Sequence, residues 1–371
     1  MRMSSPAAAA RLAGLVVSLA VVSSAPVLAA DATYAERLGW KAGDRVVIIH
    51  VDDAAMSHES NVGALRSIRE GVASSTSVMI PCPWVPEFAA ELRKTPTIDA
   101  GLHLTLTAEW DVYCWGPLTG KPAAPGLVDP RGCLWPDVAS VVQHATPDEV
   151  EAEIRAQIKR ARELGFEPTH LDSHMGTLFA TPELLERYIK VGVEERIPIM
   201  FPGGHRTALR AQYMAEQGSV PERFTQAGEV GKRIWDSGLP VLDDLHNVSY
   251  GWRPDAGAKT LAHPAAEVAA HAAARAGTEA SREAWREMKV ERYSDALRQM
   301  QPGLTMIILH ATETSPTFPF ITDSGPTRQG DLDAMLDPRL KRVIAEEKII
   351  QTTFRELMER RSKAQPPPPA R

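Results

Sequence analysis

The fold is decided by one stretch, Arg45-Val46-Val47-Ile48-Ile49-His50-Val51-Asp52-Asp53. Its apolar run is continuous, which is typical of a parallel strand buried on both faces, and it ends in a pair of acids. Similar short runs recur along the chain and alternate with helical patterns. We expect strands at Arg45–Val51, Thr76–Ile80, Ala100–Leu106, Thr169–Asp172, Ile197–Phe201, Val241–Leu245, Leu304–His310 and Lys348–Thr352.

Helical segments lie between these strands, and two of them carry clear start signals. Thr146-Pro147-Asp148-Glu149 offers an N-cap, a proline in the first turn and a capping-box glutamate, and Thr181-Pro182-Glu183 is similar. Helices are expected at residues 59–70, 146–164, 181–195, 279–300 and 333–347. Strand–helix alternation predicts a parallel sheet with right-handed crossovers. The length of 371 residues favours closure of that sheet into an α/β barrel.

Composition is that of an ordinary soluble globular protein. The chain has 41 Lys and Arg against 47 Asp and Glu, a formal charge of −6, and 44% hydrophobic residues. This balance excludes disordered and collagen-like chains. Because no run of five or more basic residues occurs, we expect no nucleic-acid partner.

The first 29 residues have the pattern of a cleaved signal peptide. Arg2 and Arg11 precede an apolar run from Leu12 to Val22, and Val27-Leu28-Ala29 has the small-residue pattern of a cleavage site. The alternative, a membrane anchor, needs about 20 apolar residues, and this run is shorter. We therefore expect a periplasmic or secreted protein without a transmembrane segment.

The mature chain is expected to form one domain, residues 30–362, followed by a Pro-rich disordered tail at 363–371. Two stretches, at about 107–145 and 203–262, break the strand–helix alternation and are expected to be long loop insertions. The first insertion holds Trp110 and Trp115. Their rings either stack on a sugar or anchor the loop to the scaffold.

The three cysteines have different expected roles. Cys114 and Cys133 bracket one loop, and in an oxidising compartment we expect them to form a disulfide. Cys82 lies between two prolines and is expected to be a buried small side chain rather than a nucleophile. The alternative is three unpaired thiols.

Acids and histidines lie at the ends of four expected strands, where parallel barrels carry their catalytic groups. Asp52 and Asp53 follow the first strand, His103 lies in the third, and His310 ends the seventh. The fourth contains His170-Leu171-Asp172-Ser173-His174, and strand periodicity puts its three polar side chains on one face. Burying that face in an apolar core would be costly, so a polar cavity is favoured.

One carboxylate and two histidines facing one cavity suit a divalent metal ion and leave positions for water and substrate. Asp53, His103 and His174 are the candidate ligands. Each has an alternative when taken singly, because strand histidines are often hydrogen-bonded in a core and acid pairs often cap helices. The convergence of four strand ends favours the metal site.

These motifs resemble the blocks of a known family, the YdjC-like carbohydrate deacetylases, which include chitooligosaccharide and hopanoid-biosynthesis deacetylases. The similar segments, in the family's order, are Val47–Asp53, Gly71–Ser77, Ala100–Leu106 and Pro168–His174. The chain departs from the family pattern after the acid pair, after His174 and after His310. The departures are Ala54-Ala55, Met175-Gly176-Thr177 and Ala311-Thr312.

The resemblance implies a distorted TIM-like (β/α) barrel related to the polysaccharide-deacetylase fold. It implies one divalent ion, Mg²⁺ or Zn²⁺, held by Asp53, His103 and His174, which activates water to remove N-acetyl groups from an amino sugar. Asp52 matches the proposed general base, and His310 is the provisional general acid. We also expect substrate contacts from four other residues, Trp110, Trp115, His170 and Asp172.

The expected substrate is an N-acetylated carbohydrate or glycolipid, and a signal peptide favours an exported glycan. Two alternatives stay open. A metal-dependent esterase or phosphoesterase would use the same activation of water, and a non-catalytic periplasmic glycan-binding protein would keep only the scaffold. The chain keeps both acids, Asp52 and Asp53, and both ligand histidines, His103 and His174. Their retention argues against the non-catalytic alternative.

Overall fold

The computed structural model describes residues 32–254 and 281–364. The expected signal peptide, the tail from residue 365 and residues 255–262 of the second expected insertion lie outside the described residues. The strands are β1 (Arg45–Ala54), β2 (Ser75–Val78), β3 (Ala100–Leu104), β4 (Leu171–Ser173), β5 (Asp244–His246), β6 (Gly303–Leu309) and β7 (Ile350–Gln351). Among the described helices, none is long and apolar enough to cross a membrane.

The strands form one parallel sheet in the order β4-β3-β2-β1-β6-β5, and β7 pairs with the beginning of β1. Two isolated parallel bridges, Leu171 with Ile199 and Pro202 with Leu242, continue the sheet from β4 towards β5. The strand expected at 197–201 is therefore reduced to these bridges. The sheet curls into a distorted TIM-like (β/α) barrel, which confirms the expected fold class.

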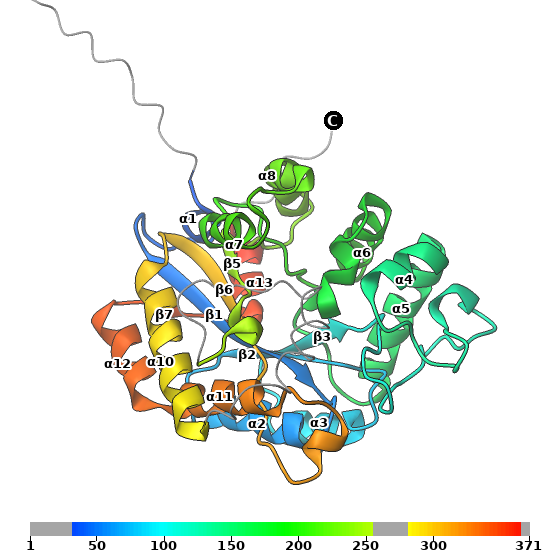
Figure 1. Ribbon diagram of the computed structural model, residues 1–371. Coiled ribbons are helices and arrows are strands. Elements are labelled where there is room, and N and C mark those ends of the chain that lie inside the picture. Colours follow the sequence, from blue (N-terminus) through cyan, green and yellow to red (C-terminus); the bar gives the residue numbers. More distant parts are fainter. Residues whose placement is uncertain (1–31, 255–280, 365–371) are drawn as a thin grey trace, which may run out of the picture. The chain divides into compact units, whose positions relative to one another are not determined.

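Helices surround the strands (Figure 1). Contacts join α2 to α3 and α11, α10 to α11 and α12, and α5 to α6. The helices are α1 (Tyr34–Arg37), α2 (His58–Arg69), α3 (Val85–Lys94), α4 (Val138–His144), α5 (Pro147–Glu163), α6 (Pro182–Glu195), α7 (Thr207–Gln217), α8 (Glu222–Asp236), α10 (Arg282–Gln299), α11 (Gly325–Leu336), α12 (Pro338–Glu346) and α13 (Phe354–Lys363).

Two of these helices begin as their sequences predict. The Thr146 side chain accepts a hydrogen bond from the backbone N–H of Glu149, whose carboxylate accepts in return from the Thr146 N–H, completing a capping box at α5. Thr181 caps α6 by accepting from the Leu184 N–H.

Alternating side chains on each strand separate the barrel interior from the surrounding helices. On β1, Val47 and Ile49 pack in the large cluster shared with the helices, whereas Val46 and Ile48 pack with Met306 in an inner cluster. The same alternation places the side chains of His50 and Asp52 inside the barrel, because they are the next two alternate residues of β1 after Ile48. Polar groups therefore follow an apolar layer toward the carboxyl ends of the strands.

The helix expected at 333–347 is divided into α11 and α12. Pro338 cannot donate a backbone hydrogen bond within a helix, and the chain breaks just before it. Asp337 caps the new helix by accepting from the Arg339 N–H at 2.9 Å. The expectation of one continuous helix was wrong because this proline is a first-turn residue of α12 and not an interior one.

Neither expected insertion is a loop throughout, since the first ends in α4 (Val138–His144) and the second also contains helices. The first, 107–145, holds the expected disulfide between Cys114 and Cys133, whose Cα atoms lie 6.0 Å apart, and Cys82 is a buried free thiol. The second, 203–262, is not a loop, because it contains α7 and α8. In α8, Gly231 approaches the backbone of Gly203 so closely that a Cβ at either position would collide with the other.

Candidate metal and catalytic site

The carboxyl ends of β1, β3, β4 and β6 bring the predicted site residues together. The Asp53 Oδ1 atom lies 3.3 Å from His103 Nε2 and 3.5 Å from His174 Nδ1. The His310 Nε2 atom lies 3.9 Å from the Asp52 Oδ2 atom. Asp52 and the three candidate ligands are buried, and only His310 is partly exposed. Residues spread from position 52 to position 310 of the sequence thus form one cluster.

A local turn of the backbone allows both acids of the pair to face this cluster. Strict alternation would point Asp53 away from the interior once Asp52 points into it. Asp53 instead has a φ of 63°, and the pairing of β1 with β2 shifts register between Val51 and Ala54. A left-handed conformation at a non-glycine residue costs on the order of 1–3 kcal/mol and is concentrated at functional sites.

The geometry around Asp53, His103 and His174 fits a metal ion. One ligand atom from each lies within 4.8 Å of the others, and Asp53 Oδ1 has no hydrogen-bond partner among the described residues. The outer ring nitrogen of each histidine meets a carboxylate. His103 Nδ1 lies 2.6 Å from Asp172 Oδ1, and His174 Nε2 lies 3.0 Å from Glu109 Oε2. Carboxylates in this position orient metal-binding histidines and fix the tautomer that leaves the inner nitrogen free.

Electrostatics at the cluster favour a bound cation. Burial lowers the pKa of His174, but Glu109 and Asp53 outweigh burial and raise it to about 9. The pKa of His103 is held well above its ordinary value, because the neighbouring carboxylates again outweigh burial. A site that holds protons this tightly can exchange them for a divalent ion, since metal and proton compete for the same ring nitrogens.

Arg328, from α11, is a site residue that sequence reasoning missed. Its buried guanidinium lies 2.8 Å from Asp53 Oδ2, and its Nε–H donates to Ser324 Oγ at 2.8 Å. It also lies over the ring of Tyr250, 5.1 Å from the centroid. Although burial raises the pKa of Asp53, the Arg328 charge together with the neighbouring His103 and His174 outweighs burial and holds that pKa well below its ordinary value. An arginine in a polar helix carries no local signal that distinguishes it from a surface residue.

Glu109 was missed for a different reason. It lies in the first insertion, beside Trp110, and a single acid in a loop is not distinctive. Its contact with His174 depends on the loop folding back over the strand ends, where the Tyr113 hydroxyl donates to Met56 O at 2.6 Å.

His310 faces the acid pair from the end of β6. Its backbone N–H donates to Asp331 Oδ2 at 3.1 Å, and the ring of Tyr250 packs edge-on against the imidazole. Burial lowers the pKa of His310 below its ordinary value. The imidazole is therefore neutral at neutral pH in this state, and it must gain a proton before it can act as an acid.

The four expected substrate-contact residues have other contacts. Trp110 and Trp115 are buried and pack edge to face, and Trp115 Nε1–H donates to Thr107 O at 3.1 Å. His170 and Asp172 are fully buried beneath the ligands. These contacts favour the loop-anchoring alternative for the two tryptophans, and a role of the four residues in substrate binding stays a prediction.

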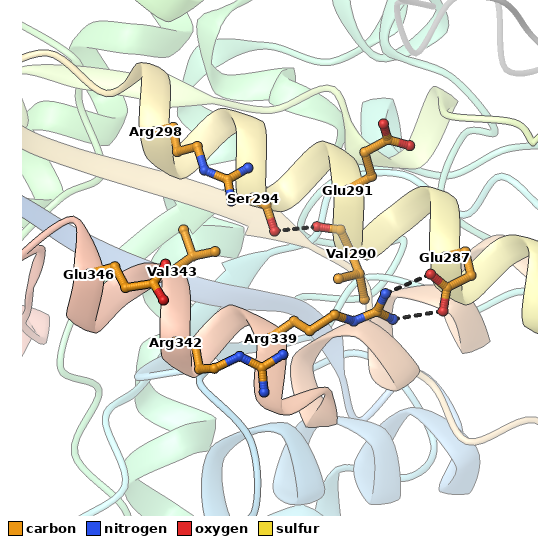
Figure 2. Close-up of a pocket in the computed structure, with 9 residues that line it drawn as sticks. All are labelled: Glu287, Val290, Glu291, Ser294, Arg298, Arg339, Arg342, Val343 and Glu346. Carbon is orange, nitrogen blue, oxygen red and sulfur yellow. Dashed lines mark hydrogen bonds and ion pairs between the residues drawn. The ribbon is translucent and has the colours of Figure 1, made fainter.

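A separate groove of about 470 Å³ lies between α10 and α12, on the helices outside the sheet (Figure 2). Its walls carry charges of both signs. Arg339 and Glu287 form a bidentate ion pair, with Nη1–Oε2 and Nη2–Oε1 distances of 2.6 and 2.7 Å. None of the acid–histidine groups found among the described residues lies in this groove. It is separate from the strand-end cluster.

The fold and the site together are those of an α/β-barrel enzyme, because acids and histidines gather at the carboxyl ends of the parallel strands. Within that class the chain belongs to the YdjC-like protein family, whose model matches residues 46–346. It is 29% identical over 311 residues to a carbohydrate deacetylase of Thermus thermophilus, covering 84% of this chain and 93% of that protein. It is 31% identical over 156 residues to a carbohydrate deacetylase of Brevibacillus brevis, covering 42% and 59%.

A solved structure supports the same fold. The crystal structure of a candidate cellobiose-phosphate cleavage protein from Enterococcus faecalis matches this chain with a TM-score of 0.62. The match covers 85% of this chain and 99% of the other at 18% sequence identity.

Proposed function

We propose that this protein is a carbohydrate deacetylase that uses a divalent ion to remove the N-acetyl group from an amino sugar. The observation that carries the proposal is the unpartnered Asp53 Oδ1 facing two imidazoles, each backed by a carboxylate. Membership of the YdjC-like family and relatives named carbohydrate deacetylases support the same reaction.

The proposed ligands of the ion are Asp53, His103 and His174. An ion in this position acidifies water and polarises the acetyl carbonyl. Arg328 holds the second oxygen of the Asp53 carboxylate, so the first oxygen keeps its direction toward the two imidazoles. Glu109 and Asp172 orient the two histidines from behind.

Asp52 and His310 are the proposed proton-transfer pair. Asp52 accepts the proton that water loses as its oxygen attacks the acetyl carbon. The carbon–nitrogen bond then breaks, acetate forms, and the sugar nitrogen takes a proton from the His310 imidazole. Asp52 Oδ2 and His310 Nε2 lie 3.9 Å apart, a gap that one water could bridge to carry the proton from Asp52 to the imidazole.

Acetate release tests this proposal directly. The purified protein is stripped with a chelator, reloaded with Zn²⁺ or Mg²⁺, and assayed on N-acetylglucosamine oligosaccharides, an aryl acetate and an aryl phosphate. We expect equal amounts of acetate and free amine from the sugars, only in the reloaded protein. Faster turnover of the ester or phosphate would instead support the esterase or phosphoesterase alternative.

We also propose that the enzyme acts outside the cytoplasm on an exported N-acetylated glycan or glycolipid. The signal-peptide pattern at residues 1–29 supports this location. The Cys114–Cys133 disulfide supports it independently, because such bonds persist in oxidising compartments. Cell fractionation with amino-terminal sequencing tests the proposal. A mature protein that begins near Ala30 in the exported fraction is expected, and an uncleaved cytoplasmic protein would contradict it.

A further inference from the structure

A second group of potential ion ligands lies inside the barrel, beneath the first. His50 comes from β1, and His170 and Asp172 come from the segment that forms β4. All three side chains are buried, and one ligand atom from each lies within 4.8 Å of the others. This group shares no residue with the Asp53, His103 and His174 set, and of its members the reaction proposed above uses only Asp172, which orients His103.

Two atoms of this group have no hydrogen-bond partner among the described residues, His170 Nε2 and Asp172 Oδ2. They face each other at 3.7 Å, and Asp172 Oδ2 lies 3.0 Å from His50 Nε2. A buried polar atom without a partner is unfavourable, so this arrangement is explained if something binds between the two atoms.

The outer nitrogen of each histidine is already held by a hydroxyl group. His50 Nδ1 lies 3.0 Å from Ser75 Oγ, and His170 Nδ1 lies 3.0 Å from Thr169 Oγ1. Such contacts orient each ring so that its Nε2 points toward Asp172, as the partners of metal-binding histidines do.

Packing also fixes the position of the His170 ring. The ring stacks on Phe354 with centroids 4.0 Å apart. On its other side lies Gly101, where an added Cβ would come within 2.5 Å of the ring. The ring has this position because residue 101 is a glycine.

The Asp52 carboxylate borders this group, since Asp52 Oδ1 lies 3.1 Å from His50 Nε2, but Asp52 is kept for its role as the proposed general base. Tetrahedral zinc with bonds of about 2.0–2.1 Å places its ligand atoms roughly 3.3–3.4 Å apart. Two separations within the group, 3.0 Å from Asp172 Oδ2 to His50 Nε2 and 3.7 Å from Asp172 Oδ2 to His170 Nε2, bracket that value. Two imidazoles and one carboxylate are also a ligand set that suits zinc.

We propose that His50, His170 and Asp172 form a second divalent-cation site. It goes beyond the proposed function, because it adds an ion to the one that the reaction uses. The two sites are linked through Asp172, whose other oxygen lies 2.6 Å from the first-site ligand His103. An ion there would hold Asp172 and, through it, the ring of His103.

A proton on His50 is the competing occupant. Burial lowers the pKa of His50, but hydrogen bonds with Asp172 and Asp52 outweigh it and raise it to about 9. A protonated His50 would satisfy both carboxylates without a metal, and the stoichiometry of bound metal separates the two states.

The test counts zinc ions per chain by elemental analysis after dialysis of the Zn²⁺-loaded protein. We expect two ions in the wild type, one in His170→Ala, one in His174→Ala, and two in the control His144→Ala, whose side chain lies on the exposed face of α4. One ion in the wild type, unchanged in His170→Ala, would overturn the proposal and leave the proposed function intact. A wild-type protein that holds no zinc would count against both the second site and the proposed function.

Anomalous diffraction at the zinc edge from wild-type crystals provides a readout that does not depend on the variants folding. A peak between His50 Nε2 and His170 Nε2, in addition to one beside Asp53, is the expected result. A single peak beside Asp53 would overturn the second site.

Discussion

Glu109 Oε2 lies 3.0 Å from His174 Nε2, so a loop carboxylate holds the side of the imidazole that faces away from Asp53. We expect Glu109→Gln to weaken zinc binding at the first site by about 10–100-fold, the usual effect of losing such a partner. Competition titration against a zinc chelator measures this change. The control is Glu70→Gln, which alters an exposed ion pair on the surface. Equal affinities for the two variants would show that Glu109 does not orient His174.

Arg328 neutralises Asp53 inside the protein, and its removal leaves that carboxylate unpaired. We expect Arg328→Gln to lower the free energy of unfolding of the metal-free protein by roughly 3–5 kcal/mol. The loss should be smaller with Zn²⁺ bound, because the ion then balances the Asp53 charge. Urea denaturation with and without zinc measures both values. Arg233→Gln, which breaks an exposed pair with Glu186, is the control and should change stability by at most about 1 kcal/mol.

Asp52 is the proposed general base, and Asn at this position keeps the volume without the basic oxygen. We expect Asp52→Asn to lower kcat for acetate release by about 10²–10⁴-fold while zinc stays at the first site. Asp148→Asn, at the exposed start of α5, is the control and should leave kcat unchanged. Wild-type turnover by Asp52→Asn would exclude Asp52 as the base.

The Cys114–Cys133 disulfide closes a loop with a sequence separation of 19 residues. We expect the double variant Cys114→Ser/Cys133→Ser to lose about 3 kcal/mol of stability, the value for a loop of this length. Thermal or urea denaturation measures the loss, and a reductant should destabilise the wild type but have no further effect on the variant. An unchanged unfolding midpoint would show that the loop is constrained by its packing alone.

Much of the candidate site was predictable because it lies on regular strands. Continuous apolar runs located β1 and β6, and the period of two placed the side chains of His170, Asp172 and His174 on one face. The resemblance to the YdjC-like family then separated the ligand histidines from the others.

The residues that were missed owe their roles to tertiary contacts. Glu109 and Arg328 come from a loop and a distant helix, and neither position has a periodic signal. The positive φ of Asp53 is also invisible in a strand pattern, although it turns the second acid into the site. In α8, Gly228 and Gly231 weaken the helical signal, and close backbone packing at Gly231 explains one of them.

The central claim is that Asp53, His103 and His174 hold the ion on which acetate release depends. Its most direct test is His174→Ala, analysed for zinc per chain and for acetate released from an N-acetylglucosamine oligosaccharide, beside the wild type and His144→Ala. We predict that bound zinc falls by one ion and acetate release is lost in His174→Ala alone. Unchanged zinc content together with full acetate release in that variant would contradict the account.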